Sequence, residues 1–188
     1  MNRRTRFGHG LLAVVIWATG LTAVGSPARA DAAAVRFEEY QVKAAFLYSF
    51  ARFVEWPADH PFATTDEIRI GIVGRDPFGD ALDRTLQGKT ILGRKPEIRR
   101  YETPEQIEAC HVLFIGNDQV AAMPQILERL DGAPVLTVGE WDGFVEDGGI
   151  IGFVVEQNRV RFEIDPEAAK RSGLKLSSKL LGVARIVR

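Results

Sequence analysis

The chain has 188 residues, of which 46% are hydrophobic and 26% are charged. This length suffices for one well-packed domain and is too short for two comfortable ones. The first thirty residues hold four arginines and no acidic side chain, so without them the formal charge falls from −1 to about −5, which excludes the basic surface of a nucleic-acid-binding protein.

These first residues have the pattern of a cleaved export signal. A basic segment at residues 3–6 precedes an apolar run from Leu11 to Val24, and residues 28–30 read Ala-Arg-Ala, the small-x-small form of a signal-peptidase site. An uncleaved membrane anchor is the alternative, but the apolar run is interrupted by a glycine and is shorter than the ~20 residues that span a bilayer. The sequence therefore predicts a signal peptide over 1–30 and a mature chain over 31–188 in the periplasm.

The stretch from Tyr40 to Pro57, YQVKAAFLYSFARFVEWP, is predicted to be a helix with more apolar surface than one buried face requires. Its apolar side chains spread over an arc of roughly 200°, whereas a helix that packs on a sheet needs a stripe only a little over ~100° wide. The surplus, mostly Phe46, Phe50 and Phe53, must be covered by another helix or by another protein chain.

Strand and helix patterns then alternate, which predicts an α/β fold. Residues 112–115 are apolar throughout, as in a central parallel strand, and Asp76 followed by Pro77 has the pattern of a helix N-cap. The expected elements are strands at 68–73, 98–101, 112–115 and 135–138 and helices at 77–87, 105–109 and 119–130. We expect a single-domain, three-layer sandwich in which helices cover both faces of a mostly parallel sheet.

An antiparallel hairpin is predicted to complete the sheet. Its strands span residues 150–156 and 159–165 and meet at Gln157-Asn158, where asparagine tolerates a positive φ. In this register every cross-strand pair on one side is apolar: Val155–Val160, Phe153–Phe162 and Ile151–Ile164. A short helix over 166–171 and a last helix, capped by Ser177 and running to Val187, are expected to follow.

No pattern in the chain indicates catalysis. Gly71, Gly74 and Gly79 surround a turn, but their spacing differs from that of a nucleotide-binding loop, and Asp76 would place a carboxylate where a phosphate should lie. The histidines lack zinc-ligand spacing, and no G-x-S-x-G nucleophile elbow is present. We therefore expect a protein that is not an enzyme and has no catalytic residue, cofactor or metal.

A small-ligand-binding protein is one hypothesis for the function. Folds of this class bind ligands in the crevice at the carboxyl ends of the parallel strands. Six residues would converge there: Gly74, Arg75, Asp76, Asn117, Asp118 and Glu140. One small domain has no second lobe to close over a ligand, so this hypothesis takes second place.

Several segments of the mature chain together are typical of one family. They are YQVKAAFLYSFARFVEWP, IGIVGRDPFGDAL, GKTILGRKPEI, CHVLFIG, LTVGE, GGIIGFVVEQNRVRFEID and LSSKLLGVARIV. In order and spacing they resemble the YfiR/HmsC-like family of periplasmic proteins. The resemblance implies a regulator that binds the periplasmic sensor portion of an inner-membrane diguanylate cyclase, and thereby lowers cyclic di-GMP and biofilm formation.

The single cysteine, Cys110, cannot pair within the chain. Its place before an apolar run favours a buried thiol, with an intermolecular disulfide as the alternative. Family members that look redox-sensitive pair the cysteine of this strand with one where this chain has Gly71, and carry a further pair near the late hairpin. Because both pairs are lost here, the resemblance implies that this protein lacks that redox control or uses Cys110 between chains.

Aromatic side chains are expected to bind the partner, although ordinary core packing is the alternative for each of them. Phe46, Phe50, Phe53 and Trp56 would form one contact surface, and Trp141 and Phe144, in an otherwise polar loop, another. We also expect a homodimer, formed through apolar surface on the first helix or through the sheet edge.

Overall fold

The computed structural model describes residues 27–61, 63 and 65–187. Its helices, the 3₁₀ helices η1 and η2 included, are α1 (Pro27–Arg52), α2 (Ala81–Leu86), η1 (Pro104–Gln106), η2 (Asn117–Ala122), α3 (Met123–Arg129), α4 (Pro166–Arg171) and α5 (Ser178–Leu181). Its strands are β1 (Val54–Glu55), β2 (Glu67–Val73), β3 (Lys95–Tyr101), β4 (Val112–Ile115), β5 (Leu136–Gly139), β6 (Ile151–Glu156), β7 (Arg159–Ile164), β8 (Lys175–Leu176) and β9 (Arg185–Ile186). The predicted signal peptide lies outside the described residues except for 27–30, which begin α1.

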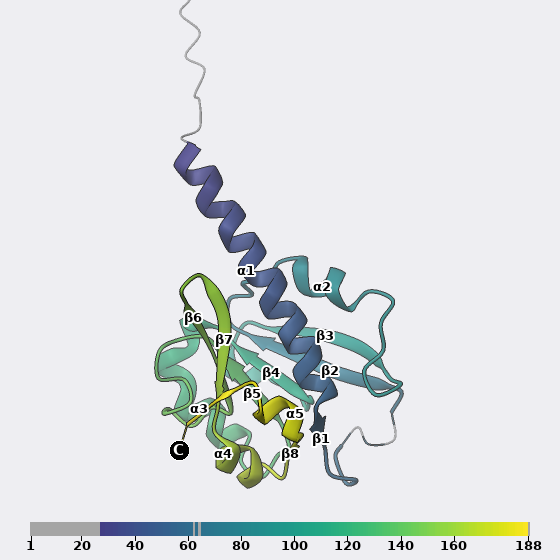
Figure 1. Cartoon of the computed structure of the whole chain (residues 1–188). Helices are drawn as coiled ribbons and strands as arrows, with labels where there is room; N and C mark the ends of the chain where they lie inside the picture. The colour runs from purple at the N-terminus through teal and green to yellow at the C-terminus, as the bar shows by residue number, and fades with distance from the viewer. Residues whose placement is uncertain (1–26, 62, 64, 188) are drawn as a thin grey trace, which may run out of the picture.

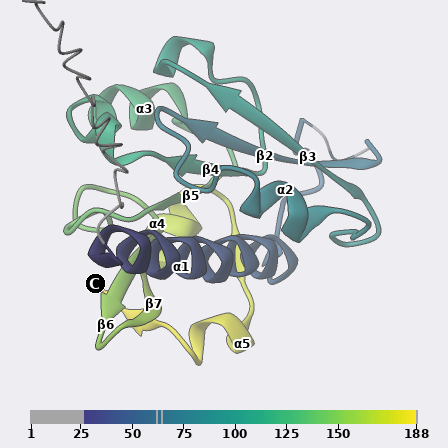
Figure 2. The same ribbon diagram turned by 90° about the horizontal axis from the view of Figure 1, so that it is seen from above.

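A seven-stranded sheet with the order β3-β2-β4-β5-β6-β7-β9 forms the centre of the structure (Figure 1). Strands β2 to β6 are parallel, whereas β7 is antiparallel to β6. Seen from above, β6 and β7 lie on the other side of α1 from β2 and β3, so the sheet curls around α1, and α3 lies on the opposite face (Figure 2). The predicted α/β fold, a mostly parallel sheet with helices on both faces, is confirmed.

The hairpin has the predicted register. Phe153 pairs with Phe162, and the neighbouring pairs on the same face are the expected apolar ones. Gln157 and Asn158 both have positive φ, 49° and 59°, as in the primed turns that match the twist of the flanking strands. Strand β4 is also as predicted, because it lies between β2 and β5 and is buried along its whole length.

This hairpin covers the surplus apolar surface of α1. The Phe50 ring lies 4.9 Å from the Phe162 ring and 5.6 Å from the Phe153 ring, and Phe46 packs 5.2 Å from Phe162. Phe50 is 0% exposed. The cover is thus part of the same chain, and the prediction of Phe50 as a partner contact is wrong because its ring is enclosed in the core.

Helix α1 differs from its prediction at both ends. It begins before Tyr40, at Pro27, and it ends at Arg52 instead of continuing to Pro57. It stops because the following backbone pairs elsewhere: the Ser177 N–H donates to the Phe53 carbonyl over 3.0 Å, and β1 pairs with β8. Long-range pairing therefore overrides the helical pattern.

Other predicted helices are shorter than expected. Asp76 accepts a hydrogen bond from the Phe78 N–H over 2.7 Å within a turn, so it is not the N-cap of α2. That helix begins only at Ala81, after Gly79 with a φ of +53°. The last helix ends at Leu181, because the chain continues into β9, which pairs with β7.

Replacing Phe50 with alanine is expected to cost about 3–5 kcal/mol of unfolding free energy, because the cavity would lie among the rings of the hairpin. Urea denaturation followed by circular dichroism measures this loss. The matched control is Phe37→Ala on the same helix, where 49% exposure limits the loss to less than about 1 kcal/mol. Equal stability of the two variants would contradict the burial of Phe50.

Candidate functional site: a partner-binding surface

At the carboxyl ends of β2 and β4 the predicted crevice is narrow. The Arg75 N–H donates to Asp118 Oδ1 over 2.9 Å, which joins the loops after the two strands. A Cβ atom at Gly74 would lie 2.5 Å from the same oxygen, so the loops approach each other more closely than a side chain would allow. Burial alone would raise the pKa of Asp118, but hydrogen bonds from Arg75 and Gln119 lower it. Gly74, Arg75 and Asp118 are therefore brought together, as predicted.

Of the other three predicted crevice residues, two are paired within the protein and one is exposed. Asp76 pairs with Arg100 over 2.7 Å, and Asn117 is exposed at the start of η2. Glu140 accepts hydrogen bonds from Lys43 Nζ over 2.7 Å and from the Tyr40 hydroxyl over 3.1 Å. Both carboxylates thus already have partners in the protein, and ligand binding in the crevice stays a prediction.

Lys43 is a buried charge that sequence reasoning missed. It is 3% exposed, and its Nζ lies 2.5 Å from Glu39 and 2.7 Å from Glu140. The ammonium also lies 4.7 Å from the centre of the Tyr40 ring. Since a buried charge must be paired, these contacts fix α1 to the loop after β5. A lysine within the apolar face of the predicted helix was the signal that could have indicated them.

The remaining aromatic residues of the first predicted surface are half-buried. Phe46 and Phe53 pack against the core cluster with part of each ring exposed. Trp56 donates its indole N–H to the His111 carbonyl over 3.2 Å, and the two rings meet edge to face. Trp56 therefore joins the segment after α1 to the start of β4.

The second predicted surface lies on the opposite face of the sheet, and one of its residues is a core residue. Phe144 is 0% exposed. A Cβ atom at Gly139 or Gly149 would lie 2.2 or 2.1 Å from its ring, so only glycine leaves room for it. The prediction of Phe144 as a contact is wrong for this reason. Trp141 is half-buried, packs edge to face on Phe144 and donates to Asp147 over 2.9 Å.

Three exposed valines, which sequence reasoning did not single out, lie on α1 and on the hairpin against which Phe46 packs. Val42 and Val35 are 44% and 60% exposed and lie one and three turns before Phe46 on the same side of α1. Val155, near the hairpin tip, is 52% exposed and shares a face with Phe153. We call Val35, Val42 and Val155 the outer strip; α1, which carries the first two, extends beyond the sheet at its N-terminal end (Figure 1).

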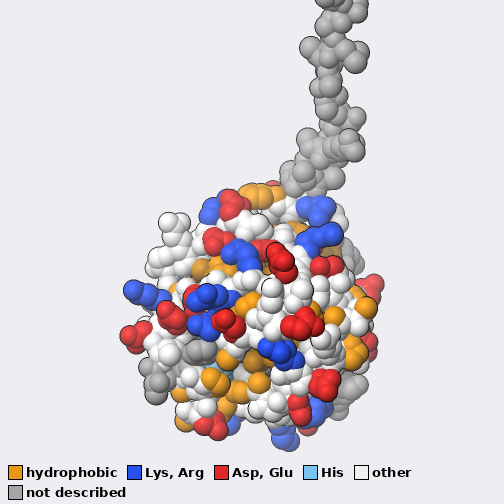
Figure 3. All heavy atoms as spheres, turned by 180° about the vertical axis from the view of Figure 1, so that it is seen from behind, with side chains coloured by type: hydrophobic (Ala, Val, Ile, Leu, Met, Phe, Trp, Pro, Cys, Tyr) orange, Lys and Arg blue, Asp and Glu red, His pale blue; other side chains and the backbone are white. Residues whose placement is uncertain are grey.

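The face opposite to that in Figure 1 has a mixed surface. Acidic and basic side chains are interspersed over it, and the hydrophobic side chains between them form small separate patches (Figure 3). Across the described part of the chain, no three His, Cys, Asp or Glu side chains gather closely enough to hold a metal ion. The outer strip is therefore the surface that we consider for a partner.

Two histidines stack at the opposite end of the parallel strands. The rings of His60 and His111 lie 4.2 Å apart, and both side chains are buried. The Arg69 N–H donates to His111 Nδ1 over 3.0 Å. Burial lowers the pKa of both, and for His111, with His60, Arg94 and Arg69 nearby, the pKa falls from 6.5 to about 3.

Acid is therefore expected to destabilise the fold through His111. The unfolded chain binds this proton near pH 6.5 and the folded chain only near pH 3. The contribution of neutral His111 to the free energy of unfolding is therefore fully present above pH 6.5 and is lost as the pH drops from 6.5 toward 3. At pH 5 the expected loss is about 2 kcal/mol relative to pH 8. Urea titrations at both pH values measure it, and His111→Asn should reduce the difference. An unchanged pH dependence in that variant would contradict the assignment.

Cys110 is buried, 1% exposed, and burial raises the pKa of its thiol to about 12. The predicted buried thiol is thus confirmed, and an intermolecular disulfide would require this thiol to become exposed. A Cβ atom at Gly71 would lie 3.5 Å from Cys110 Sγ, with Leu113 and Tyr101 at 3.0 and 3.1 Å. Gly71 is thus next to Cys110, and it is the position where the resemblance implies a second cysteine in the relatives.

A Gly71→Cys variant is expected to form a disulfide with Cys110 after small shifts of these neighbours. Thiol titration in denaturant should find no free thiol after oxidation and two after reduction. Gly71→Cys combined with Cys110→Ser is the control and should keep one thiol throughout. Two free thiols in the oxidised single variant would show that the two strands do not approach as described.

The comparison with known families decides the family of this chain. A YfiR/HmsC-like family model matches residues 40–185. The chain belongs to the YfiR/HmsC-like family. The match confirms the resemblance inferred from the sequence motifs. Members of this family are periplasmic regulators. Among the described residues, no helix is both long enough and apolar enough to cross a membrane.

Solved structures with a similar fold share little sequence with this chain. The ABC domain in complex with L-Trp from Streptococcus pneumonia has 11% identity and a TM-score of 0.49, over 64% of this chain and 55% of that one. A conserved domain protein from Vibrio cholerae O1 biovar eltor str. N16961 has 13% identity and a TM-score of 0.49, over 64% and 54%. This chain spans about half the length of each, and with TM-scores below 0.5 neither likeness bears on its function.

Proposed function

We propose that this protein is exported to the periplasm, where it binds and restrains an inner-membrane signalling protein. Its membership of the YfiR/HmsC-like family supports this function, and the family resemblance favours a diguanylate cyclase as the target. Binding would lower cyclic di-GMP and biofilm formation. The role is regulatory and requires no bond-making chemistry of the protein itself.

The observation that carries this proposal is the outer strip. Val35, Val42 and Val155 are each at least 44% exposed, and the first two lie on the same side of α1 as Phe46, which packs against the core. Exposed apolar side chains that gather on one surface, instead of being scattered singly, are typical of protein contacts. An apolar segment of the partner, such as one face of a helix, would cover the strip between α1 and the hairpin.

One half-buried aromatic residue, Phe46, lies next to the outer strip along α1. It follows Val42 by one turn on the same side of the helix, and its ring packs against Phe153 and Phe162 of the hairpin. The partner would therefore bind to a rigid base. Phe53, Trp56 and Trp141 lie outside the strip, and their part in partner binding stays a prediction.

A Val42→Glu variant is expected to weaken capture of the partner at least ~10-fold, because binding would bury a carboxylate in an apolar contact. The matched control is Val120→Glu on η2, since Val120 is 43% exposed and Val42 is 44% exposed. Crosslinking pull-down from the native envelope measures capture. Cyclic di-GMP in a deletion strain, complemented with each variant, measures restraint.

In that strain the wild type and Val120→Glu should lower cyclic di-GMP, and Val42→Glu should fail to do so while keeping a native circular dichroism spectrum. Full restraint by Val42→Glu would exclude the outer strip from the contact. A metabolite that specifically raises the melting temperature would instead support the small-ligand hypothesis, because only a ligand of the folded state stabilises it in this way.

A further inference from the structure

The turn between α2 and β3 holds an apolar side chain in a strained and exposed position. Leu92 is 58% exposed and has a φ of +51°, and Gly93 follows with a φ of +81°. The N–H and carbonyl of Ile91 bond to the carbonyl and N–H of Arg94, each over 2.9 Å. Two central residues with positive φ are the pattern of a type I′ turn, which favours asparagine or glycine where this chain has leucine.

A leucine at this position costs stability without a matching gain inside the chain. Apart from glycines, the other described residues with positive φ are Gln157 and Asn158, which are polar. A strained backbone destabilises the folded state, and a side chain that stays exposed recovers little through burial. Because such outliers are typical of functional contacts, Leu92 is a candidate for a contact outside the chain.

The turn is held firmly by the residues on both sides of its tip. Ile91 is 0% exposed and anchors the turn in the core. The Tyr48 hydroxyl donates to the Thr90 carbonyl over 3.3 Å, which joins the turn to α1. After the tip, the Arg94 guanidinium donates to the Ala63 carbonyl over 2.7 Å. The apolar tip therefore projects from a rigid base.

Two cations share the ring of Tyr48 at the seam between α1 and this turn. Lys89 Nζ lies 4.9 Å and the Arg52 guanidinium carbon 5.4 Å from the centre of the ring. Both side chains are exposed, and neither forms an ion pair within the described residues. Residues 84–96 contain four basic side chains and no acidic one. The seam is thus a basic patch in a mature chain that is acidic as a whole.

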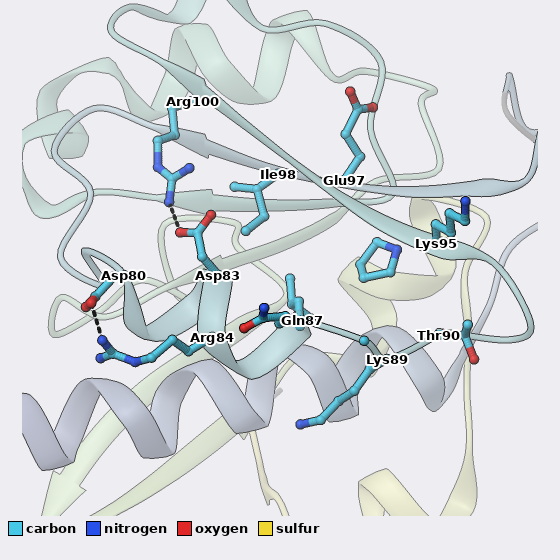
Figure 4. Close-up of a pocket in the computed structure, with 13 residues that line it drawn as sticks. Asp80, Asp83, Arg84, Gln87, Lys89, Thr90, Lys95, Glu97, Ile98 and Arg100 are labelled. Atoms are coloured by element: carbon cyan, nitrogen blue, oxygen red, sulfur yellow. Dashed lines mark hydrogen bonds and ion pairs between the residues drawn. The ribbon is translucent and has the colours of Figure 1, made fainter.

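The acidic side chains near the seam leave these two cations uncompensated. A groove of about 820 Å³ lies between α2 and β3, and Lys89, at the end of it, points toward α1 (Figure 4). Three acidic side chains around the groove already face cations of the chain: Asp80 with Arg84, Asp83 with Arg100, and Glu67 with Lys95. The charges of Lys89 and Arg52 therefore remain available to an anionic partner.

We propose that this turn docks on the anionic phospholipid surface of the inner membrane. Leu92 would enter the headgroup layer, where burial of its side chain is favourable. Lys89 and Arg52 would lie against lipid phosphates, which attract basic side chains close to the surface. The Tyr48 ring between them has an apolar body and a polar hydroxyl, as is typical of side chains at a membrane surface.

The shape of the turn favours lipid over a protein partner. One projecting side chain with cations behind it fits a fluid headgroup layer, whereas a protein would need a cavity that matches it. The contact would be weak and would not span the bilayer. It would hold the chain beside the membrane and thereby raise its effective concentration near a membrane-bound partner. The inference goes beyond the proposed function and requires only that the chain faces the inner membrane.

Vesicle sedimentation tests the docking with the exported chain and lipid alone. The wild type should bind vesicles of equal parts phosphatidylglycerol and phosphatidylcholine at least ~10-fold more tightly than vesicles of phosphatidylcholine. Lys89→Gln and Arg52→Gln should each weaken binding to the anionic vesicles about fivefold, because each removes one charge near the surface. Arg159→Gln, which removes one exposed charge at the hairpin tip, is the matched control and should bind like the wild type.

A Leu92→Asn variant separates docking from a structural role of the turn. Binding to the anionic vesicles should weaken at least ~5-fold, because the inserted apolar side chain is lost. The melting temperature should rise, because asparagine is favoured in this turn. Damage to the fold would instead lower both. The control is Val120→Asn on η2, where the side chain is 43% exposed, and its vesicle binding should not change.

A fluorescent label locates the inserted residue. Leu92→Cys in a Cys110→Ser background offers a single thiol for a label whose emission rises in apolar surroundings. Emission should increase when anionic vesicles are added. The same label at Val120→Cys should not respond.

Several outcomes would overturn the docking: no binding to anionic vesicles, equal binding to neutral vesicles, full binding by Leu92→Asn, or an equal response of both labels. If Leu92→Asn kept vesicle binding but lost capture of the signalling protein in lipid-free detergent solution, the turn would belong to that protein contact instead. The vesicle measurements contain no signalling protein, so their result is independent of the proposed restraint.

Discussion

The arrangement of this protein depends on the interlocking of Phe46 and Phe50 with Phe153 and Phe162. The rings of Phe46 and Phe50 each lie 4.9–6.2 Å from those of Phe153 and Phe162 and join the first helix to the late hairpin, and aromatic contacts at this distance stabilise beyond the area that they bury. With the Lys43–Glu140 ion pair at 2.7 Å, they fix the position of α1 across the sheet. Because α1 is longer than the surface beneath it, its first turns leave the sheet and carry their valines to the outside.

Local patterns predict those parts of the fold that depend on near neighbours. The hairpin register follows from alternation over residues 151–164, and the central strand β4 follows from four successive buried residues. Helix ends were missed because distant backbone decides them. Nothing within the segment 40–57 indicates that Phe53 will bond to Ser177, or that β1 will pair with β8. Such long-range pairing overrides the helix propensity of a segment, as tertiary context commonly does.

The candidate site shows a similar division. Three of the predicted crevice residues, Gly74, Arg75 and Asp118, do meet, since loops after neighbouring parallel strands share one edge. Aromatic content is a poor guide to exposure, because large rings are also the side chains that fill a core. Phe50 and Phe144 are enclosed for that reason, while smaller valines remain outside. Whether an apolar side chain of α1 is buried or exposed depends on where the hairpin lies, and the helix pattern does not contain that information.

The order of the strands also affects how fast the chain folds. Apart from the hairpin, neighbours in the sheet are separated by long stretches of chain, and topologies of this kind close slowly. The ring of Phe50 finds its cover only when Phe162 has been made and folded, more than a hundred residues later. The aromatic face of α1 is therefore among the first apolar surfaces that a ribosome delivers and among the last that the polypeptide hides from water.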